Sequence, residues 1–301
     1  MTSLTIFAPS GAPSSTRPAR LAVRRLRALG FDARLDEAAL LRHQRFAGDD
    51  DSRLGALHRV ARQGPSVAMA LRGGYGMSRL LDGVDWRLLG RSCERGTRWV
   101  GYSDVTALHL GLLAHAGAVS WAGPMATGDF GRPDAEGGLD DVTVDCFREA
   151  MAGELEAVGF RVPAGFDGLE VRGTLWGGNL AIVCAMLGTR HWPAVRGGVL
   201  FLEDVGEHPY RIERMLLQLH QAGVIERQKA VLLGSFTDWE KASNDRGYGL
   251  KDAIEALRSR TRVPILTGLP FGHVRTRVTL PVGRKVTLAV ATRDAFLAWG
   301  R

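Results

Sequence analysis

A serine at a sharp turn is the residue of this sequence best placed to do chemistry. Residues 97–101 are typical of a buried strand and residues 105–115 of a helix, so Ser103 lies at the turn between them. Such a turn exposes a hydroxyl at the carboxyl edge of a sheet, and the helix start directs N–H groups at negative charge. This pattern is close to a G-x-S-x-G nucleophile elbow, although Val105 replaces the second glycine. Two interpretations therefore stand: Ser103 is a nucleophile, or it is only a helix N-cap.

An acid and a histidine later in the chain could complete a hydrolytic site. Glu203 and Asp204 follow an apolar strand predicted at 199–202, where acids face the ligand crevice of α/β proteins. His273 follows a strand predicted at 264–267, in a loop shaped by glycine and proline, and is a candidate general base. A carboxylate can orient such a histidine, although Glu203 is equally a loop acid or a helix cap. The sequence alone leaves open whether Ser103, Glu203 and His273 meet.

A glycine-rich turn, Arg-Gly-Gly-Tyr-Gly at 72–76, follows the apolar strand predicted at 66–71. It satisfies neither the dinucleotide-binding fingerprint nor the P-loop pattern. Glycines there would let backbone N–H groups converge on an oxyanion, and the alternative is a plain tight turn.

The remaining histidines and the cysteines give weaker signals. We expect structural roles for His109 and His220, whereas the positions of His115 and His208 near turns leave their roles open. No spacing typical of zinc ligands is present, so no metal site is expected. Three widely spaced cysteines fit reduced thiols in the cytoplasm better than a disulfide framework, and they are Cys93, Cys146 and Cys184.

Composition narrows the class of protein. The chain has 301 residues and a formal charge of +7, but its basic residues are spread along the sequence and mixed with acids. This is typical of a solvated surface and does not indicate nucleic-acid binding. No apolar run is long enough to predict a transmembrane helix. The basic helix at 17–27 could suggest a transit peptide, but a strand predicted at 4–8 precedes it, so we expect a cytoplasmic protein.

Alternating strands and helices predict the fold. Residues 1–135 form a parallel-sheet α/β domain, and a stretch rich in Gly, Asp and Glu, 136–168, is predicted to connect it to a second domain at 169–301. The tail alternates in period two over 277–280, 285–291 and 295–299, which predicts an antiparallel β meander in that second domain.

Several linked motifs resemble the LD-carboxypeptidases, the serine peptidases of the muramoyl-tetrapeptide type. The resemblance runs from residue 4 to about residue 283, and its motifs occur in the family's order. They are Ala-Pro-Ser-Gly at 8–11, Phe-Ala-Gly at 46–48, the turn at 72–76, Gly-Tyr-Ser-Asp at 101–104, Gly-Thr-Leu-Trp-Gly-Gly-Asn at 173–179, Leu-Glu-Asp at 202–204, Pro-Tyr-Arg-Ile-Glu-Arg at 209–214 and Gly-His at 272–273.

The resemblance implies specific roles. It implies a catalytic triad of Ser103, His273 and Glu203, with the nucleophile in a flavodoxin- or Rossmann-like N-terminal domain and the site between the two domains. It also implies an oxyanion hole formed by the backbone N–H groups of Asp104 and Gly74, with the N–H of Gly73 as the next candidate. Weaker candidates for substrate binding are Arg72, Trp176 and Asn179, although Trp176 could be a core residue and Asn179 a helix cap.

The implied activity is release of the terminal D-Ala from murein tetrapeptide, by cutting the L,D bond after diaminopimelate during cytoplasmic cell-wall recycling. The resemblance implies a homodimer and no cofactor. Two alternatives stay open: an immunity-type peptidase that cleaves an antibiotic peptide-nucleotide, and a non-catalytic ligand-binding α/β protein.

Overall fold

The computed structural model describes residues 1–300, which divide into two compact units. Unit 1 comprises residues 1–154, 189–193 and 275–283, and unit 2 comprises residues 155–188, 194–274 and the remaining C-terminal residues. The predicted connection at 136–168 contains a helix of unit 1 and a strand of unit 2, so its glycines and acids mark turns around ordered elements. Within residues 1–300, no helix has the length and apolar character needed to cross a bilayer.

Unit 1 is built on a six-stranded sheet in the order β11-β5-β4-β3-β1-β2. Its strands are β1 (Thr2–Phe7), β2 (Phe31–Leu35), β3 (Val67–Ala70), β4 (Arg98–Gly101), β5 (Ser120–Ala122) and β11 (Leu280–Val282). The first five run parallel, as predicted, because a helix or turn-rich crossover separates each from the next. The apolar run of β3 is fully buried, as expected for a strand covered on both faces.

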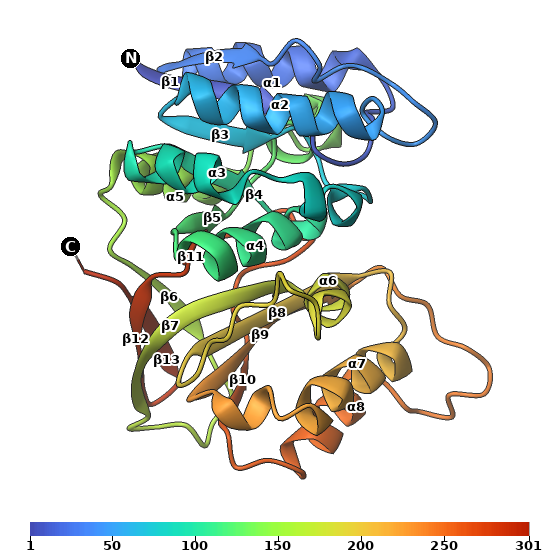
Figure 1. The fold of residues 1–301 in the computed structure, drawn as a ribbon. Helices are drawn as coiled ribbons and strands as arrows, with labels where there is room; N and C mark the ends of the chain where they lie inside the picture. The colour runs from blue at the N-terminus through green and yellow to red at the C-terminus, as the bar shows by residue number, and fades with distance from the viewer. Residues whose placement is uncertain (301) are drawn as a thin grey trace. The chain divides into compact units, whose positions relative to one another are not determined.

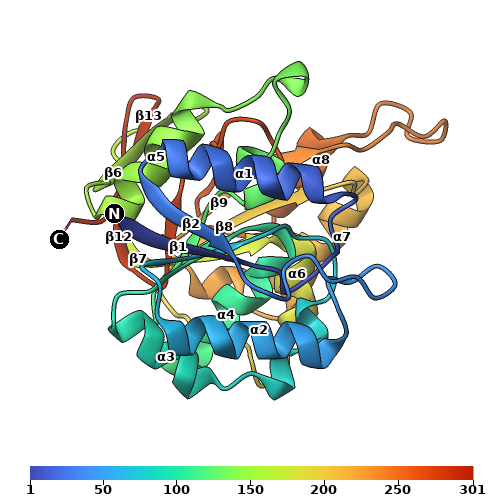
Figure 2. The same cartoon turned by 90° about the horizontal axis from the view of Figure 1, so that it is seen from above.

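Helices cover both faces of this sheet. They are α1 (Thr16–Ala28), α2 (Asp50–Gln63), α3 (Trp86–Glu94), α4 (Thr106–Ala116) and α5 (Asp141–Ala152). Figure 2 shows α1 and α5 on one face of the sheet and α2, α3 and α4 on the other. Helix α3 and strand β5 were not predicted, and the stretch that follows the glycine-rich turn forms two 3₁₀ turns, Met77–Arg79 and Leu81–Gly83.

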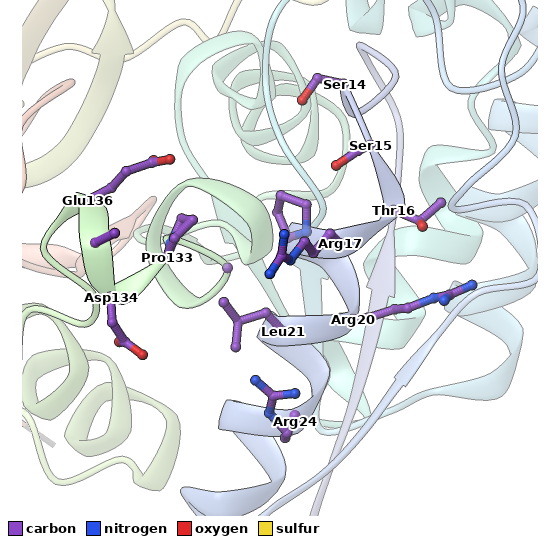
Figure 3. Close-up of a pocket in the computed structure, with 13 residues that line it drawn as sticks. Ser14, Ser15, Thr16, Arg17, Arg20, Leu21, Arg24, Pro133, Asp134 and Glu136 are labelled. Atoms are coloured by element: carbon purple, nitrogen blue, oxygen red, sulfur yellow. The ribbon is translucent and has the colours of Figure 1, made fainter.

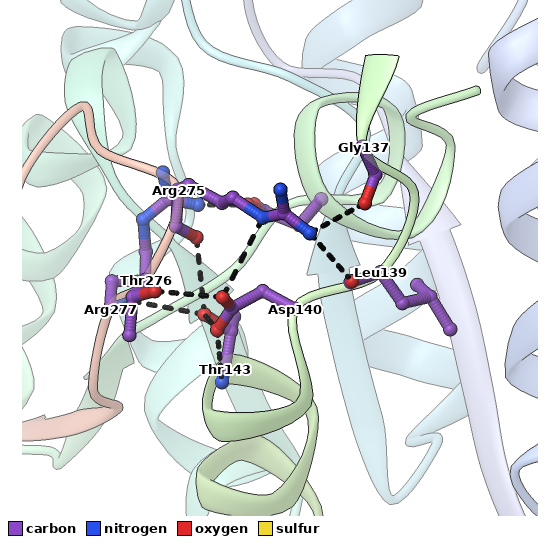
Figure 4. Close-up of polar contacts among 8 residues, drawn as sticks. Gly137, Leu139, Asp140, Thr143, Arg275, Thr276 and Arg277 are labelled. Atoms are coloured by element: carbon purple, nitrogen blue, oxygen red, sulfur yellow. Dashed lines mark hydrogen bonds and ion pairs between the residues drawn. The ribbon is translucent and has the colours of Figure 1, made fainter. Parts of the chain in front are cut away.

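A segment from late in the chain completes unit 1. Strand β11 pairs antiparallel with β5, so the predicted placement of 277–280 in the C-terminal meander is wrong (Figure 1). The segment is fastened to the start of α5 by hydrogen bonds (Figure 4): Thr276 Oγ1 donates to Asp140 Oδ2 at 2.7 Å, and Arg277 N donates to Thr143 Oγ1 at 3.0 Å. Period-two alternation fixes which face of a strand is buried but not which strand it joins.

Unit 2 contains a seven-stranded sheet in the order β10-β9-β8-β7-β12-β13-β6. Its strands are β6 (Ala157–Arg161), β7 (Glu170–Asn179), β8 (Val199–Val205), β9 (Ala230–Thr237), β10 (Ile265–Thr267), β12 (Lys285–Ala291) and β13 (Asp294–Ala298). Strands β7 to β10 are parallel, whereas β7, β12, β13 and β6 are antiparallel, which confirms the meander for β12 and β13. The helices are α6 (Leu180–Met186), α7 (Pro209–Gln221) and α8 (Leu250–Arg258).

Candidate active site

Ser103 occupies a strained turn directly after β4. Its φ is +63°, a left-handed conformation that non-glycine residues adopt rarely and that is frequent at functional sites. A 3₁₀ turn, Ser103–Val105, leads into α4, whose N-cap residue is Val105. The interpretation of Ser103 as the helix cap is therefore wrong. The glycine that this turn requires is Gly101, because a Cβ there would lie 2.9 Å from Val105 Cγ1.

The side chain of Asp104 holds three turns of unit 1 together. It is buried, and its Oδ2 accepts hydrogen bonds from Ser10 Oγ at 2.6 Å and Met77 N at 2.8 Å. Burial raises the pKa of this carboxyl above its ordinary value. From the sequence, only the N–H of Asp104 has a predicted role. The signal for a role of its side chain is Ser10, in the Pro-Ser-Gly turn after β1.

The glycine-rich turn lies directly against Ser103. A Cβ built on Gly73 would lie 2.7 Å from both Cβ and Oγ of Ser103 and 3.5 Å from Asp104 N. Gly74 is exposed and has φ of +104°, which favours glycine. Arg72, just before this pair, is half-buried, and its Nη1 donates to Ala12 O at 2.8 Å. Of the two glycines considered for an oxyanion hole, Gly73 is the one that packs on the serine.

We expect the change Gly73→Ala to lower activity by about 100-fold or more while leaving the fold intact. The added methyl group occupies the space of Ser103 Oγ, and correct placement of a reacting atom is worth large rate factors. Steady-state kinetics combined with thermal melting would measure both effects.

Gly55→Ala on α2 is the matched control, because a Cβ there meets nothing within 4 Å. That change should leave turnover unchanged and raise stability by about 0.5–1 kcal/mol. Wild-type turnover by Gly73→Ala would contradict the role assigned to this contact.

In unit 2, His273 and Glu203 form a hydrogen-bonded pair. His273 Nδ1 lies 2.7 Å from Glu203 Oε2, and the carboxylate is fully buried at the end of the apolar strand β8. The loop carrying His273 can approach β8 because of two glycines. A Cβ on Gly234 would lie 2.3 Å from Phe271 O, and one on Gly272, whose φ is +141°, would lie 2.9 Å from Ser235 O. A buried carboxylate that accepts from Nδ1 fixes the orientation and tautomer of the imidazole.

Asn179 and Asp204 form a polar network next to this pair. Asn179 lies opposite Glu203 in the β7–β8 register, and its Nδ2 donates to Asp204 Oδ1 at 2.8 Å and contacts Glu203 Oε1 at 3.4 Å. Its Oδ1 accepts from Ile182 N, which confirms Asn179 as the cap of α6. Ala181 N donates to the second oxygen of Asp204 at 2.9 Å. Asn179 thus supports the acid of the pair and also starts a helix.

Burial raises the pKa of Asp204 to about 6, which predicts a pH-dependent contribution to stability. The folded state binds this proton more tightly than the unfolded chain, so the contribution is complete below about pH 4 and is lost as pH rises through about 6. The loss can reach about 3 kcal/mol. The wild-type advantage over Asp204→Asn in free energy of unfolding should therefore shrink between pH 4 and pH 6.5. An advantage that stays constant over that range would refute this prediction.

Two domains of a known protein family match this chain. The LD-carboxypeptidase N-terminal domain matches residues 4–123, and the LD-carboxypeptidase C-terminal domain matches residues 172–288. The chain belongs to the LD-carboxypeptidase family. Membership confirms the resemblance drawn from the motifs, and it makes this LD-carboxypeptidase a hydrolase of the serine-peptidase class.

Individual relatives agree with the family models. The murein tetrapeptide carboxypeptidase of Pseudomonas aeruginosa is 32% identical, over 94% of this chain and 92% of its own length. A crystal structure of muramoyltetrapeptide carboxypeptidase from Oxalobacter formigenes is 38% identical, covers 100% of this chain and 99% of its own, and has a TM-score of 0.90. The microcin C7 self-immunity protein is 20% identical in a solved structure with a TM-score of 0.84, covering 98% of this chain and 95% of its own, a likeness of fold alone.

Trp176 does not have the surroundings of a substrate-binding residue. This LD-carboxypeptidase buries its ring completely, and Trp176 Nε1 donates to Gln228 Oε1 at 3.0 Å. The core-packing interpretation of Trp176 fits this environment, and substrate binding does not. Residues 175–179 of β7 are all buried, as expected for a strand of a parallel sheet that is covered on both faces.

The other histidines of this LD-carboxypeptidase have separate partners. His109 is buried, with its ring nitrogens 2.9 Å from Ser120 Oγ and Gly101 O, and burial lowers its pKa to about 4, which confirms a structural role. His115 bonds to His191 at 2.9 Å, and His208 caps α7 while its Nε2 lies 3.0 Å from Asp245 Oδ2.

The three cysteines are free thiols whose pKa values are raised by burial, which disfavours the reactive thiolate. Among residues 1–300, no group of three His, Cys, Asp or Glu side chains is arranged to hold a metal ion.

A separate groove lies at the start of α1 (Figure 3). It has a volume of about 890 Å³. Hydroxyl side chains just before and at the start of α1 line it together with Arg17, Arg20 and Arg24 of that helix, facing Asp134 and Glu136. It contains none of the predicted site residues. Its walls carry both basic and acidic side chains.

Proposed function

We propose that this LD-carboxypeptidase releases the terminal D-Ala from murein tetrapeptide by hydrolysing the L,D bond after diaminopimelate. The observation that carries the proposal is the buried Glu203 carboxylate bonded to His273 Nδ1, in a family whose members are serine peptidases. The relative from Pseudomonas aeruginosa, named a murein tetrapeptide carboxypeptidase, supports the substrate. As part of the same proposal, the protein acts as a cytoplasmic homodimer in cell-wall recycling.

The proposed mechanism is acyl transfer through a triad of Ser103, His273 and Glu203. Since Nδ1 of His273 donates to Glu203, its Nε2 is the nitrogen that takes the proton as Ser103 Oγ attacks the scissile carbonyl. Glu203 stabilises the imidazolium that results. The imidazolium then protonates the departing amine of D-Ala, and water, deprotonated by the same histidine, hydrolyses the acyl-enzyme.

Backbone N–H groups would hold the oxyanion of each tetrahedral intermediate. We assign this role to the N–H groups of Asp104 and Gly74, with Gly73 in contact with the nucleophile. The positive φ of Ser103 supports the assignment, because a left-handed residue at the turn reorients the next N–H group relative to the strand.

Chain connectivity supports combining Ser103 with the His273–Glu203 pair. The guanidinium carbon of Arg277 lies 4.2 Å from the ring centroid of Tyr102, the residue before Ser103. His273 lies only four residues before Arg277, a span of at most about 14 Å along an extended chain. The histidine is therefore tied covalently to a segment that packs beside the nucleophile turn.

The decisive experiment is incubation of the purified protein with murein tetrapeptide and detection of free D-Ala by mass spectrometry. Murein tripeptide, which lacks the terminal D-Ala, is the matched control substrate. Release of D-Ala with formation of tripeptide is the expected result. Absence of release, together with hydrolysis of an aminoacyl-nucleotide analogue, would replace this proposal with the immunity-type activity.

A further inference from the structure

A carboxypeptidase has to recognise the free carboxylate at the end of its substrate. That carboxylate belongs to the residue just after the scissile carbonyl, about 3.8 Å further along the peptide. The group that binds it must therefore be a close neighbour of the nucleophile. A guanidinium is the side chain best suited to the task, because its planar fork matches the two carboxylate oxygens.

Arg72 is held beside the nucleophile by the backbone of the glycine-rich turn. It immediately precedes Gly73, which packs on Ser103, and its Nη1 is anchored by Ala12 O at 2.8 Å. A Cβ on Gly74 would lie 3.7 Å from Arg72 Nη2, and one on Gly11 would lie 3.7 Å from Arg72 Cζ. Because both positions are glycine, no side chain from either covers the guanidinium.

Charge pairing separates Arg72 from Arg53 and Arg79, and burial separates it from Arg45, which is exposed. Arg53 is fully buried and committed to Pro9 O, Gly76 O and the carboxylate of Asp50. Arg79 also pairs with Asp50, at 2.7 Å. Within residues 1–300, Arg72 has no carboxylate within ion-pair distance. A half-buried cation without an acidic partner is expected to attract an anionic group of a ligand.

We propose that Arg72 is the specificity-determining residue that binds the C-terminal α-carboxylate of the peptide substrate. The proposal rests on the proposed carboxypeptidase function and adds the group that distinguishes a terminal residue from an internal one. The Ala12 contact fixes the guanidinium in advance, so little side-chain entropy is lost when the carboxylate binds. The ligand class is therefore a peptide with a free carboxylate, and a C-terminal amide or an extended chain would be a poor substrate.

The test compares murein tetrapeptide with the same peptide carrying a C-terminal amide. Wild type should prefer the free acid by on the order of 100-fold in kcat/KM, because an unpaired guanidinium penalises the amide. Arg72→Ala should lower kcat/KM for the acid by about 100-fold and change that for the amide by less than about 3-fold, so the preference disappears. Arg72→Lys keeps the charge without the fork and should retain an intermediate preference.

Arg45→Ala is the matched control. Arg45 is exposed, lies 5.8 Å from the ring centroid of Tyr75, and removing it also deletes one positive charge near the turn. It should keep the acid-to-amide preference of wild type. The inference is overturned if wild type cleaves acid and amide equally, if Arg72→Ala lowers both substrates by the same factor, or if Arg45→Ala removes the preference. Failure of the proposed function looks different, since wild type would then release nothing from either peptide.

Discussion

Replacement of Ser103 by alanine is expected to lower kcat for murein tetrapeptide by about 10⁴- to 10⁶-fold while the protein stays folded. The change removes the attacking oxygen, and no second serine, threonine or cysteine lies among residues 102–105, the turn between β4 and α4. Release of D-Ala under single-turnover conditions, with thermal melting as a check on folding, would measure the loss. The residual rate would come from oriented binding and the oxyanion hole.

Ser66→Ala is the matched control for that experiment. Ser66 precedes β3 and bonds to Ser3, so it lies at the amino end of the strands, on the sheet edge opposite Ser103. It should keep wild-type turnover and lose only a little stability. Near wild-type turnover by Ser103→Ala would end the assignment of this residue as the nucleophile.

Replacement of His273 by alanine is expected to have an effect of similar size, about 10⁴- to 10⁶-fold in kcat. Without the imidazole, Ser103 has no base, and the buried Glu203 carboxylate loses its 2.7 Å hydrogen bond to His273. A milder change, Glu203→Gln, keeps the shape of the side chain but removes the negative charge that stabilises the imidazolium. It should lower kcat by about 10⁴-fold. Because triad members act as a unit, Ser103→Ala combined with His273→Ala should be no slower than either single variant.

The structure offers a competing histidine–carboxylate pair as the control. His208 Nε2 lies 3.0 Å from Asp245 Oδ2, also beyond the carboxyl ends of the parallel strands of unit 2. His208→Ala removes an imidazole that contacts a carboxylate, as His273→Ala does, and leaves the carboxylate in place. It also removes the cap of α7. It should destabilise the protein without abolishing turnover. If His208→Ala lost as much activity as His273→Ala, the choice of general base would be wrong.

Local patterns in the sequence predicted most elements but not how they pair. The apolar strands and their following helices could be predicted because burial and periodicity are properties of neighbouring residues. Strand β5 has only three residues, and β11 joins a sheet whose other strands end more than 150 residues earlier, so neither leaves a strong local signal. Pro281 in β11 fits its position at the edge of the sheet.

For the candidate site too, local features could be predicted but long-range contacts could not. The residue types and the strand-end positions of Ser103, Glu203 and His273 could be predicted, whereas the supporting contacts could not. Asp104 bonds to Ser10 across 94 residues, and the meeting of His273 with Glu203 depends on the missing side chain at Gly272. Such contacts arise from tertiary packing, which a single sequence does not display.

The return of β11 to the first sheet has a consequence for synthesis on the ribosome. When the first 154 residues have emerged, five strands of the first sheet are available, but the outer edge of β5 stays bare until residues 280–282 are translated. An unpaired strand edge is a site of aggregation in a nascent chain. Truncation before β11 would therefore yield an N-terminal fragment that associates through β5, so dividing the gene between the two units would leave the first sheet with an exposed edge.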